Sequence, residues 1–409
     1  MSSATLSLTR KVSIYETVFI KLFEKMPYGR LVVELPDGNQ LRFGNGEGVR
    51  ASIRVSNMDF FSKCALYGDV GFAESYVDGD WNTDSIADIV SWFILNISHN
   101  PVLSGKGLPK YFSNFLTIVN KLYHKTRKNT IEGSRKNISE HYDLGNDFYK
   151  LFLDETMTYS SAIFKSPDTE LAIAQYEKYD RLCRQINLLP TDHLLEIGSG
   201  WGGFATHAAR HYGCRVTTIT ISEAQFNYTN ERIQREGLAD KISVHLQDYR
   251  TLEGQFDKIV SIEMLEAVGH NYLPAYFKKC NELLKSTGSL ALQVITSQDK
   301  RYNEHRKNVD FIQKHIFPGS QTPSFAYIHQ VVSKVSDLNL YDMKDMGLDY
   351  AKTLRMWYDY FNQQLHAVRN LGMSEAFIRK WNYYLQYCEA GFSTRHVTVK
   401  QLIYTRPYA

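Results

Sequence analysis

The sequence predicts an α/β fold, in which a doubly wound parallel sheet follows a small N-terminal α+β domain. The first supporting observation is the stretch 193–203, His-Leu-Leu-Glu-Ile-Gly-Ser-Gly-Trp-Gly-Gly, where a short apolar run meets a glycine-rich turn. The second is a regular alternation between helical patterns and apolar segments, with strands expected at 215–221, 242–247, 257–263 and 288–295. Closing strands are expected at 338–345 and 396–405.

The N-terminal hundred residues carry shorter elements. Residues 12–26 have apolar side chains at three- and four-residue steps, which predicts a helix whose apolar face lies in a core or on a membrane. Residues 30–57 alternate between apolar and polar, and Pro36-Asp37-Gly38-Asn39 predicts a hairpin turn. Helical spacing returns over 58–97, with a break at Asp78-Gly79-Asp80. We therefore expect residues 1–100 to form a separate small domain.

A basic connector is expected at 101–136. Lysines and arginines are frequent in this segment, whereas Glu132 is its single acidic residue. Aromatic residues such as Phe112 and Tyr123 lie among the cations. This combination favours docking on an anionic membrane surface, and a solvated linker helix packed on its neighbour explains it equally well.

Composition narrows the possible functions. Lys and Arg number 47 against 44 Asp and Glu, and a net charge of +3 argues against a dedicated nucleic-acid binder. The five cysteines include no Cys-x-x-Cys pair, which predicts reduced thiols in a cytoplasmic protein and no metal site. No apolar run reaches the roughly 18 residues of a membrane span, and charged residues interrupt the N-terminal segment where a signal peptide would need its apolar core. We expect a peripheral protein on the inner face of the membrane.

The glycine turn predicts a nucleotide-binding element. Gly198, Gly200 and Gly203 fit the dinucleotide pattern G-x-G-x-x-G, which alone is a weak signal. The strand at 215–221 ends without the acidic residue that an NAD ribose needs, whereas Glu196 directly precedes the first glycine. This arrangement resembles motif I of S-adenosylmethionine-dependent methyltransferases. An ordinary strand-to-helix turn without a ligand is the alternative, but so many glycines weaken a fold unless a ligand must approach the backbone.

Further motifs follow one another in a fixed order, at 141–147, 159–160, 247–249, 266–269, 316–319 and 350–354. Together they resemble the cyclopropane-fatty-acyl-phospholipid synthases and the related mycolic acid cyclopropane synthases. Segments 263–269 and 387–392 look closest to the subgroup with plant cyclopropane synthases and bacterial fatty-acid methyltransferases. The resemblance implies a class I methyltransferase-like catalytic domain at 137–409. Asp78-Gly79-Asp80-Trp81 resembles the N-terminal lipid-handling domain of the longer bacterial enzymes.

The resemblance also implies an S-adenosylmethionine site. Gly198 and Gly200, after Glu196, are expected to approach the methionine and ribose, and Tyr159 and Ser160 to hold the amino-acid end. The remaining expected contacts are Thr220, Ile221 and Gln225 at the ribose and Asp248 and Tyr249 at the adenine. A helix N-cap is a second role for Asp248, compatible with binding.

The implied activity is transfer of a one-carbon unit from S-adenosylmethionine to the double bond of an unsaturated phospholipid acyl chain, which most simply forms a cyclopropane ring. A fatty-acid C-methyltransferase that gives a methyl-branched or methylene product is the first alternative. Methylation of a soluble small molecule and a non-catalytic lipid-binding protein are the others. The expected partners are membrane phospholipids and no nucleic acid, and a homodimer is left open.

In the cyclopropane synthases a bound bicarbonate accepts the proton. Of the family groups that hold it, Glu266 matches the glutamate, Tyr350 the tyrosine and Ile295 the backbone donor. The other positions depart from the family, because Ser161 replaces a cysteine and Gln293 a histidine.

Glu263 stands where many bacterial members have glycine, and we hypothesise that its carboxylate replaces bicarbonate. Glu263 and Glu266 are three residues apart and can share one side of a turn. Two carboxylates in one apolar pocket resist ionising together, so one pKa is expected to rise. The alternative is a structural hydrogen bond from Ser161 or Gln293 to Glu263.

Overall fold

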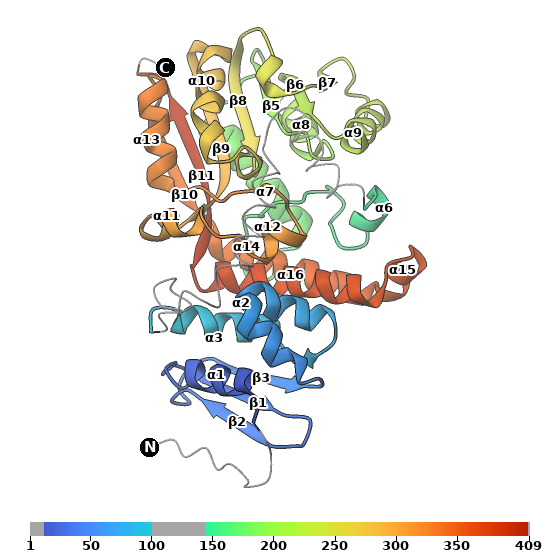
Figure 1. Ribbon diagram of the computed structural model, residues 1–409. Helices are drawn as coiled ribbons and strands as arrows, with labels where there is room; N and C mark the ends of the chain where they lie inside the picture. The colour runs from blue at the N-terminus through green and yellow to red at the C-terminus, as the bar shows by residue number, and fades with distance from the viewer. Residues whose placement is uncertain (1–11, 100–143, 408–409) are drawn as a thin grey trace. The chain divides into compact units, whose positions relative to one another are not determined.

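The computed structural model describes residues 12–99 and 144–407 and divides the chain into two compact units (Figure 1). Unit 1 contains residues 12–99 and two later segments, 308–315 and 368–396, that fall within the range predicted for the catalytic domain. Unit 2 contains the remaining described residues. The predicted boundaries at 100 and 136, and the whole basic connector between them, lie outside the described residues and stay predictions.

Unit 1 is built on a four-stranded sheet in the order β2-β1-β3-β4. The strands are β1 Arg30–Glu34, β2 Gln40–Phe43, β3 Arg50–Val55 and β4 Trp81–Asn82, and the helices are α1 Ile14–Phe23, α2 Asp59–Val77 and α3 Ile86–Asn96. The expected hairpin is confirmed, because β1 and β2 pair antiparallel. Alternation buries Leu31, Val33 and Ile53 and exposes the opposite face of the sheet. Phe19 and Phe23 of α1 are buried, so this helix contributes to a core.

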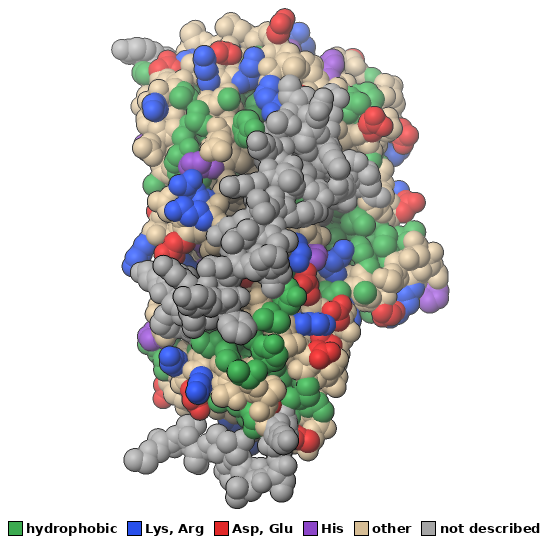
Figure 2. All heavy atoms as spheres, in the orientation of Figure 1, with side chains coloured by type: hydrophobic (Ala, Val, Ile, Leu, Met, Phe, Trp, Pro, Cys, Tyr) green, Lys and Arg blue, Asp and Glu red, His purple; other side chains and the backbone are tan. Residues whose placement is uncertain are grey.

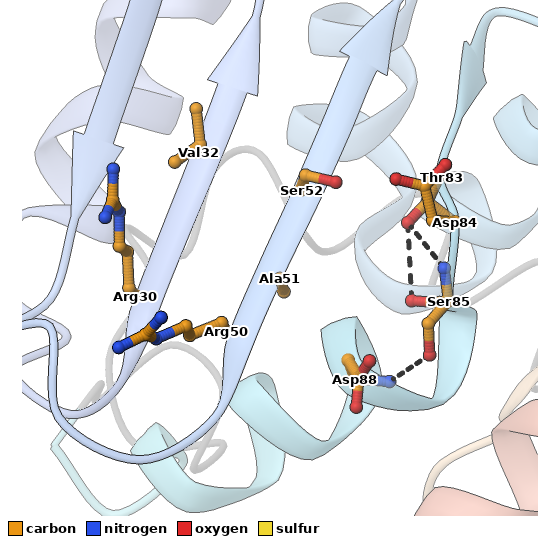
Figure 3. A pocket seen from close by; sticks show the side chains of 9 residues that line it. All are labelled: Arg30, Val32, Arg50, Ala51, Ser52, Thr83, Asp84, Ser85 and Asp88. Atoms are coloured by element: carbon orange, nitrogen blue, oxygen red, sulfur yellow. Dashed lines mark hydrogen bonds between the residues drawn. The ribbon is translucent and has the colours of Figure 1, made fainter.

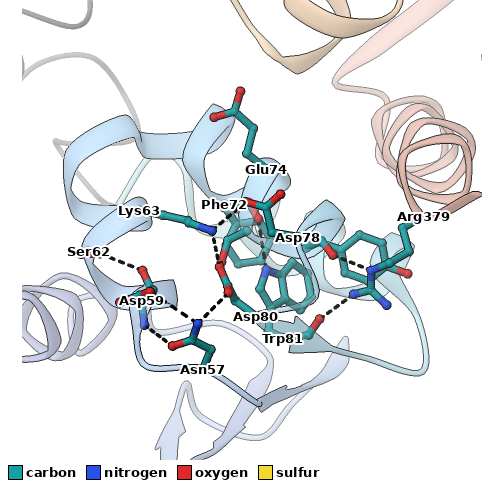
Figure 4. A network of polar contacts seen from close by, with 12 residues as sticks. Asn57, Asp59, Ser62, Lys63, Phe72, Glu74, Asp78, Asp80, Trp81 and Arg379 are labelled. Atoms are coloured by element: carbon teal, nitrogen blue, oxygen red, sulfur yellow. Dashed lines mark hydrogen bonds and ion pairs between the residues drawn. The ribbon is translucent and has the colours of Figure 1, made fainter. Parts of the chain in front are cut away.

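The predicted break at 78–80 is where α2 ends, and Asp80 forms a buried polar network there (Figure 4). Asp80 is only 5% exposed and accepts hydrogen bonds from Ser75, Lys63 and Asn57 at 2.8, 2.6 and 3.1 Å. The fully buried Trp81 donates its indole N–H to the carbonyl of Phe72. A buried carboxylate needs such donors, since burying it unpaired costs several kcal/mol.

Helix α16, Glu375–Ser393, explains why a late segment belongs to unit 1. Arg379 donates to the carbonyls of Tyr76 and Trp81 at 2.6 and 2.8 Å (Figure 4). The side chain of Gln386 accepts from the first backbone N–H group of α3, at Ile86, at 3.0 Å. The neighbouring helix α12, Phe311–His315, is tied to α2 by a hydrogen bond between His315 and Glu74.

Unit 2 contains the predicted doubly wound sheet, in the order β10-β11-β9-β8-β5-β6-β7. Strands β5 His193–Ile197, β6 Arg215–Thr220, β7 Ile242–Leu246, β8 Phe256–Ile262 and β9 Leu284–Ser297 run parallel. The closing strands β10 Asn339–Asp345 and β11 Val397–Thr405 are antiparallel additions. The carboxyl ends of the parallel strands therefore meet at one edge, the usual ligand edge of such a sheet.

Helices cover both faces of this sheet. The two cores show the arrangement, because α10 and α13 pack with Leu195 on one side while α7 and α8 pack with Leu194 on the other. The helices of unit 2 are α6 Asn146–Tyr149, α7 Leu171–Gln185, α8 Gly203–His207, α9 Glu223–Arg235, α10 Leu273–Leu283, α11 Tyr302–His305, α13 Phe325–Val335 and α14 Gly347–Gln363, and helix α15 Leu365–Asn370 begins in unit 2 and ends in unit 1. The helix expected at 204–212 is α8 followed by a π-helical turn over Ala208–Tyr212.

Charged side chains of both signs are interspersed over the visible described surface, with hydrophobic side chains between them (Figure 2). All five cysteines are free thiols. Within residues 12–99 and 144–407, no helix is both long enough and apolar enough to cross a bilayer.

Candidate active site

The glycine turn after β5 leaves open space beside one residue. Gly200 has a φ of +49°, and a Cβ built there meets no atom within 4 Å. Gly203 is different, because its Cβ would lie 2.5 Å from the Tyr179 hydroxyl. Gly203 therefore allows close packing of α8, whereas Gly200 keeps backbone accessible to a ligand. This geometry fits a nucleoside-bearing group at the turn.

The predicted ribose segment is ordered by its own hydrogen bonds. Thr220, at the end of β6, donates to Oε1 of Gln225 at 2.9 Å, and both side chains are buried. Ile221 lies between this strand and Ser222, which caps α9 by accepting from the Gln225 N–H. The structure brings these residues together beside the glycine turn, since the Gly198 N–H bonds to the carbonyl of Ile219 on the same strand.

Asp248 is confirmed as a helix cap. Its buried carboxylate accepts from the backbone N–H and the guanidinium of Arg250 at 2.9 and 2.6 Å. Tyr249 makes an edge contact with Tyr276 at 5.2 Å between ring centroids. The adenine contacts expected of Asp248 and Tyr249 stay predictions.

Glu196 lies within the sheet, where it accepts from the Thr218 hydroxyl of β6 at 2.5 Å. Burial raises the pKa of Glu196 to about 8, although the Thr218 hydrogen bond and the charge of Lys178 oppose the shift. Its expected part in the cofactor site stays a prediction.

Tyr159 and Ser160 lie in contrasting surroundings. Tyr159 is in an aromatic cluster, with ring centroids 5.2 Å from Trp357 and 5.3 Å from Tyr149. Ser160 is buried, and its hydroxyl accepts from Nζ of Lys178 at 2.7 Å. Its carbonyl accepts from the side chain of Gln175 at 3.0 Å. Helix α7 therefore holds the segment that is expected to bind the amino-acid end of the methyl donor.

Glu263 is fixed by several donors at the carboxyl end of β8. Its Oε1 accepts from the backbone N–H of Ser161 at 2.9 Å and from Nε2 of Gln293 at 2.8 Å. A hydrogen bond with Tyr350 also acts on this carboxylate. The residue has a φ of +49°, which is rare for a residue other than glycine and costs backbone energy. The hydrogen bonds weighed as the structural alternative are thus present, and they hold the carboxylate in one place.

Glu266 lies beside this group with one oxygen satisfied. The backbone N–H of Ile295 donates to its Oε1, while its buried Oε2 has no hydrogen-bond partner among the described residues. Burial first, and then the charge of Glu263, raise the pKa of Glu266 to about 8. Burial also raises the pKa of Glu263, against the hydrogen bond from Gln293 and the charge of Lys178. A pair of this kind shares a proton near neutral pH.

Two residues that the sequence analysis did not single out complete the network. Gln401 of β11 donates to Oε1 of Gln293 at 3.1 Å and to the carbonyl of Lys178 at 3.3 Å. Because Gln401 donates to that oxygen, the amide nitrogen of Gln293 must face Glu263. Lys178 is fully buried, and burial lowers its pKa to about 7 against the charges of Glu263, Asp154 and Glu196. The sequence does contain one sign of this network, because the polar residues Gln175 and Lys178 lie on the otherwise apolar buried face of α7.

The chain was compared with known proteins and structures. The family model described as mycolic acid cyclopropane synthetase matches residues 129–402. Cyclopropane-fatty-acyl-phospholipid synthase of Escherichia coli K12 is 35% identical over 386 residues, which are 91% of this chain and 95% of that protein. Tuberculostearic acid methyltransferase UfaA1 of Mycobacterium tuberculosis is 35% identical over 345 residues, 82% of this chain and 78% of that protein. The structure of mycolic acid cyclopropane synthase CmaA1 complexed with SAH and CTAB aligns with a TM-score of 0.62 and 29% identity, covering 66% of this chain and 98% of that chain.

The open space at Gly200 leads to a test of ligand binding. Gly200→Val places a branched side chain where a ligand must approach backbone, so we expect S-adenosylhomocysteine to bind at least about tenfold more weakly. Calorimetric titration measures the change. Gly237→Val is the matched control, because Gly237 also has a positive φ and open space but follows α9. Equal affinity in the parent and in Gly200→Val would remove the glycine turn from the binding site.

The buried Lys178 leads to a test of positioning. Lys178→Met removes the hydrogen bond to Ser160, so we expect the KM for S-adenosylmethionine to rise about tenfold, the scale of one charge-assisted hydrogen bond. Loss of the cation also removes an effect that lowers the pKa of Glu263, so the acidic limb of the pH–rate profile should move to higher pH. Lys165→Met, at a largely exposed lysine, is the control. A uniform loss of folded, active protein with an unmoved limb would mean that Lys178 is only structural.

Proposed function

Given that the chain belongs to the mycolic acid cyclopropane synthetase family, we propose that it transfers a one-carbon unit from S-adenosylmethionine to the double bond of an unsaturated phospholipid acyl chain. It is an S-adenosylmethionine-dependent methyltransferase. The observation that carries the proposal is the half-buried pair Glu263 and Glu266, with raised carboxyl pKa values, beside an aromatic cluster and a glycine turn with open space.

The names of the relatives support an acyl substrate and differ in the product. One names a cyclopropane fatty-acyl phospholipid and the other a methylated fatty acid. We propose a cyclopropane as the product of this chain, with a methyl-branched or methylene product as the second candidate.

The chemistry follows from what each partner offers. S-adenosylmethionine, when bound, supplies an electrophilic methyl group. An alkene is a weak nucleophile, so the protein must align it and keep water out. The attack leaves a carbocation on the acyl chain, and the ring faces of Tyr159, Trp357 and Tyr350 can stabilise that charge. Loss of a proton from the new methyl group closes the cyclopropane ring, whereas loss from a neighbouring carbon restores an alkene.

We propose that Glu263 accepts this proton in place of bicarbonate. The family positions that hold a free anion are occupied here in another way, because Ser161 and Gln293 donate to Glu263 and Ile295 donates to Glu266. The donors therefore already hold side-chain carboxylates. A tethered carboxylate also loses less freedom on positioning than a free anion does. Glu266, with its raised pKa, keeps the shared proton while Glu263 is ionised.

Peripheral attachment to the inner face of the membrane is proposed on the sequence alone. The basic connector at 101–136 supports it by composition, and its residues lie outside those that the structure describes. A phospholipid substrate requires contact with a bilayer, and anionic headgroups attract clustered cations within a Debye length.

The proposed reaction is tested by product analysis. Purified protein is incubated with S-adenosylmethionine labelled in its methyl group and with vesicles of monounsaturated phospholipid. We expect label in the lipid, and mass spectrometry of the acyl methyl esters should show a gain of one CH2 with loss of the alkene. A gain of CH2 with an alkene retained would identify the second candidate, a methyl-branched alkene or its methylene isomer, and unlabelled lipid would reject the transfer.

The role of Glu263 is tested in carbonate-depleted buffer. Glu263→Gln keeps the size but removes the base, so we expect turnover to fall by roughly 10²-fold or more. Glu263→Gly opens space for an anion and relieves the positive φ, so added bicarbonate should restore part of its activity. The parent should not respond to bicarbonate. Binding of S-adenosylhomocysteine controls for an intact site, and a parent that needs bicarbonate together with an active Glu263→Gln would contradict the proposal.

A further inference from the structure

A pocket lies wholly within unit 1, on the exposed face of its sheet (Figure 3). Its volume is about 270 Å3. This is slightly below the range of about 300–1,000 Å3 typical of drug-sized ligands, and it suits a smaller polar group. Strands β1 and β3 form one side, and the segment that enters α3 forms the other (Figure 3).

Two arginines stand directly opposite each other on the strand side. Arg30 of β1 and Arg50 of β3 are register partners in a parallel pair, and the side chain of Arg50 extends toward the strand that carries Arg30 (Figure 3). Both are exposed, and no ion pair joins either one to another described residue. Like charges directly opposite on neighbouring strands are destabilising. An anion bound between them would relieve this repulsion.

Arg54 also lies on β3, but unlike Arg50 it has an ion-pair partner among the described residues. Its guanidinium forms two hydrogen bonds with Asp84, at 2.7 and 3.2 Å. This arginine is thus already neutralised by its own chain. Arg30 and Arg50 keep their charge available, and guanidinium groups donate charge-assisted hydrogen bonds to phosphate oxygens.

The opposite side of the pocket is acidic. Thr83, Asp84, Ser85 and Asp88 line it (Figure 3). The Asp84 carboxylate is used by Arg54, and the Ser85 hydroxyl caps α3 by accepting from the backbone N–H of Asp88. The exposed carboxylate of Asp88 makes no ion pair within the part of the chain that the structure describes. A cation is the ligand that this side would attract.

We propose that the pocket binds the zwitterionic headgroup of a phosphoethanolamine lipid, with the phosphate on Arg30 and Arg50 and the ammonium group at Asp88. The argument is charge complementarity, because a simple anion is repelled by the acidic side and a simple cation by the arginines. Only a small group with both charges is attracted by both sides at once, and a primary ammonium, unlike the quaternary one of phosphocholine, can also donate hydrogen bonds to the Asp88 carboxylate. The inference rests on the proposed function in one respect, since the lipid bound would be a member of the proposed substrate class.

Vesicle binding by the full chain, without S-adenosylmethionine, tests the arginine pair. The probe is phosphatidylcholine vesicles with and without phosphatidylethanolamine, measured by flotation. The Arg30→Gln, Arg50→Gln double variant should lose at least about tenfold in affinity for the ethanolamine vesicles. Arg42→Gln is the matched control, because Arg42 lies exposed on the same face, beside Val32 but not in the pocket. An equal loss in Arg42→Gln would show general surface charge and overturn the site.

Asp88→Asn tests the cationic half of the ligand. It should remove the preference for ethanolamine vesicles and strengthen binding to anionic phosphatidylglycerol vesicles. The soluble probes glycerophosphoethanolamine and inorganic phosphate, followed by NMR titration, separate a zwitterion site from a plain anion site. Equal affinity for both probes, or no effect of any variant, would overturn the proposal. Because no step requires methyl transfer, a protein that binds the headgroup without transferring a methyl group would reject the proposed function and keep the site.

Discussion

The partial burial of the Glu263 carboxylate at the end of β8 is the constraint around which the candidate site is arranged. An unpaired buried carboxylate costs several kcal/mol, so each such group needs donors aimed at it. These donors come from separate segments, with Ser161 before α7, Gln293 on β9 and Tyr350 on α14. The positive φ of Glu263 adds a further cost that only a fixed surrounding can sustain. The donors and the strained backbone together hold the Glu263 carboxylate at one defined position.

The antiparallel strand β11 is what completes this surrounding. Gln401 and Gln293 are register partners between β11 and β9, which places the two amides side by side. Gln401 then joins Gln293 to the backbone of Lys178 on α7, while the ammonium group of Lys178 reaches Ser160. These hydrogen bonds thus connect Ser160, in the segment expected to bind the methyl donor, with Glu263, the proposed base. We therefore expect a substitution at Lys178, Gln293 or Gln401 to affect both the methyl-donor segment and the proposed base, because one set of hydrogen bonds holds both.

Features that depend on short stretches of sequence were predictable, and features that depend on distant partners were not. The glycine turn, the strands and the pair Glu263 and Glu266 can each be recognised from a few consecutive residues. Gln401 gave no such signal, because its partners lie 108 and 223 positions away. The parallel pairing of β1 with β3, which sets Arg30 against Arg50, likewise cannot be inferred from a hairpin turn. Helix α16 belongs to unit 1 through long-range contacts of Arg379, which no local pattern encodes.

The position of the base decides which product a common carbocation gives. A free anion can move within its cage, whereas Glu263 is held by its backbone and by donors on one oxygen. Burial and the charge of Glu263 raise the pKa of Glu266 to about 8, and under the proposed mechanism Glu263 is then the carboxylate that accepts the proton. If the new methyl group lies nearest to Glu263, the ring closes. If a neighbouring chain carbon lies nearest, an alkene re-forms. Under the proposed mechanism, product choice is therefore a question of acyl-chain register against a fixed carboxylate, set jointly by the position of the base and by the residues that align the chain.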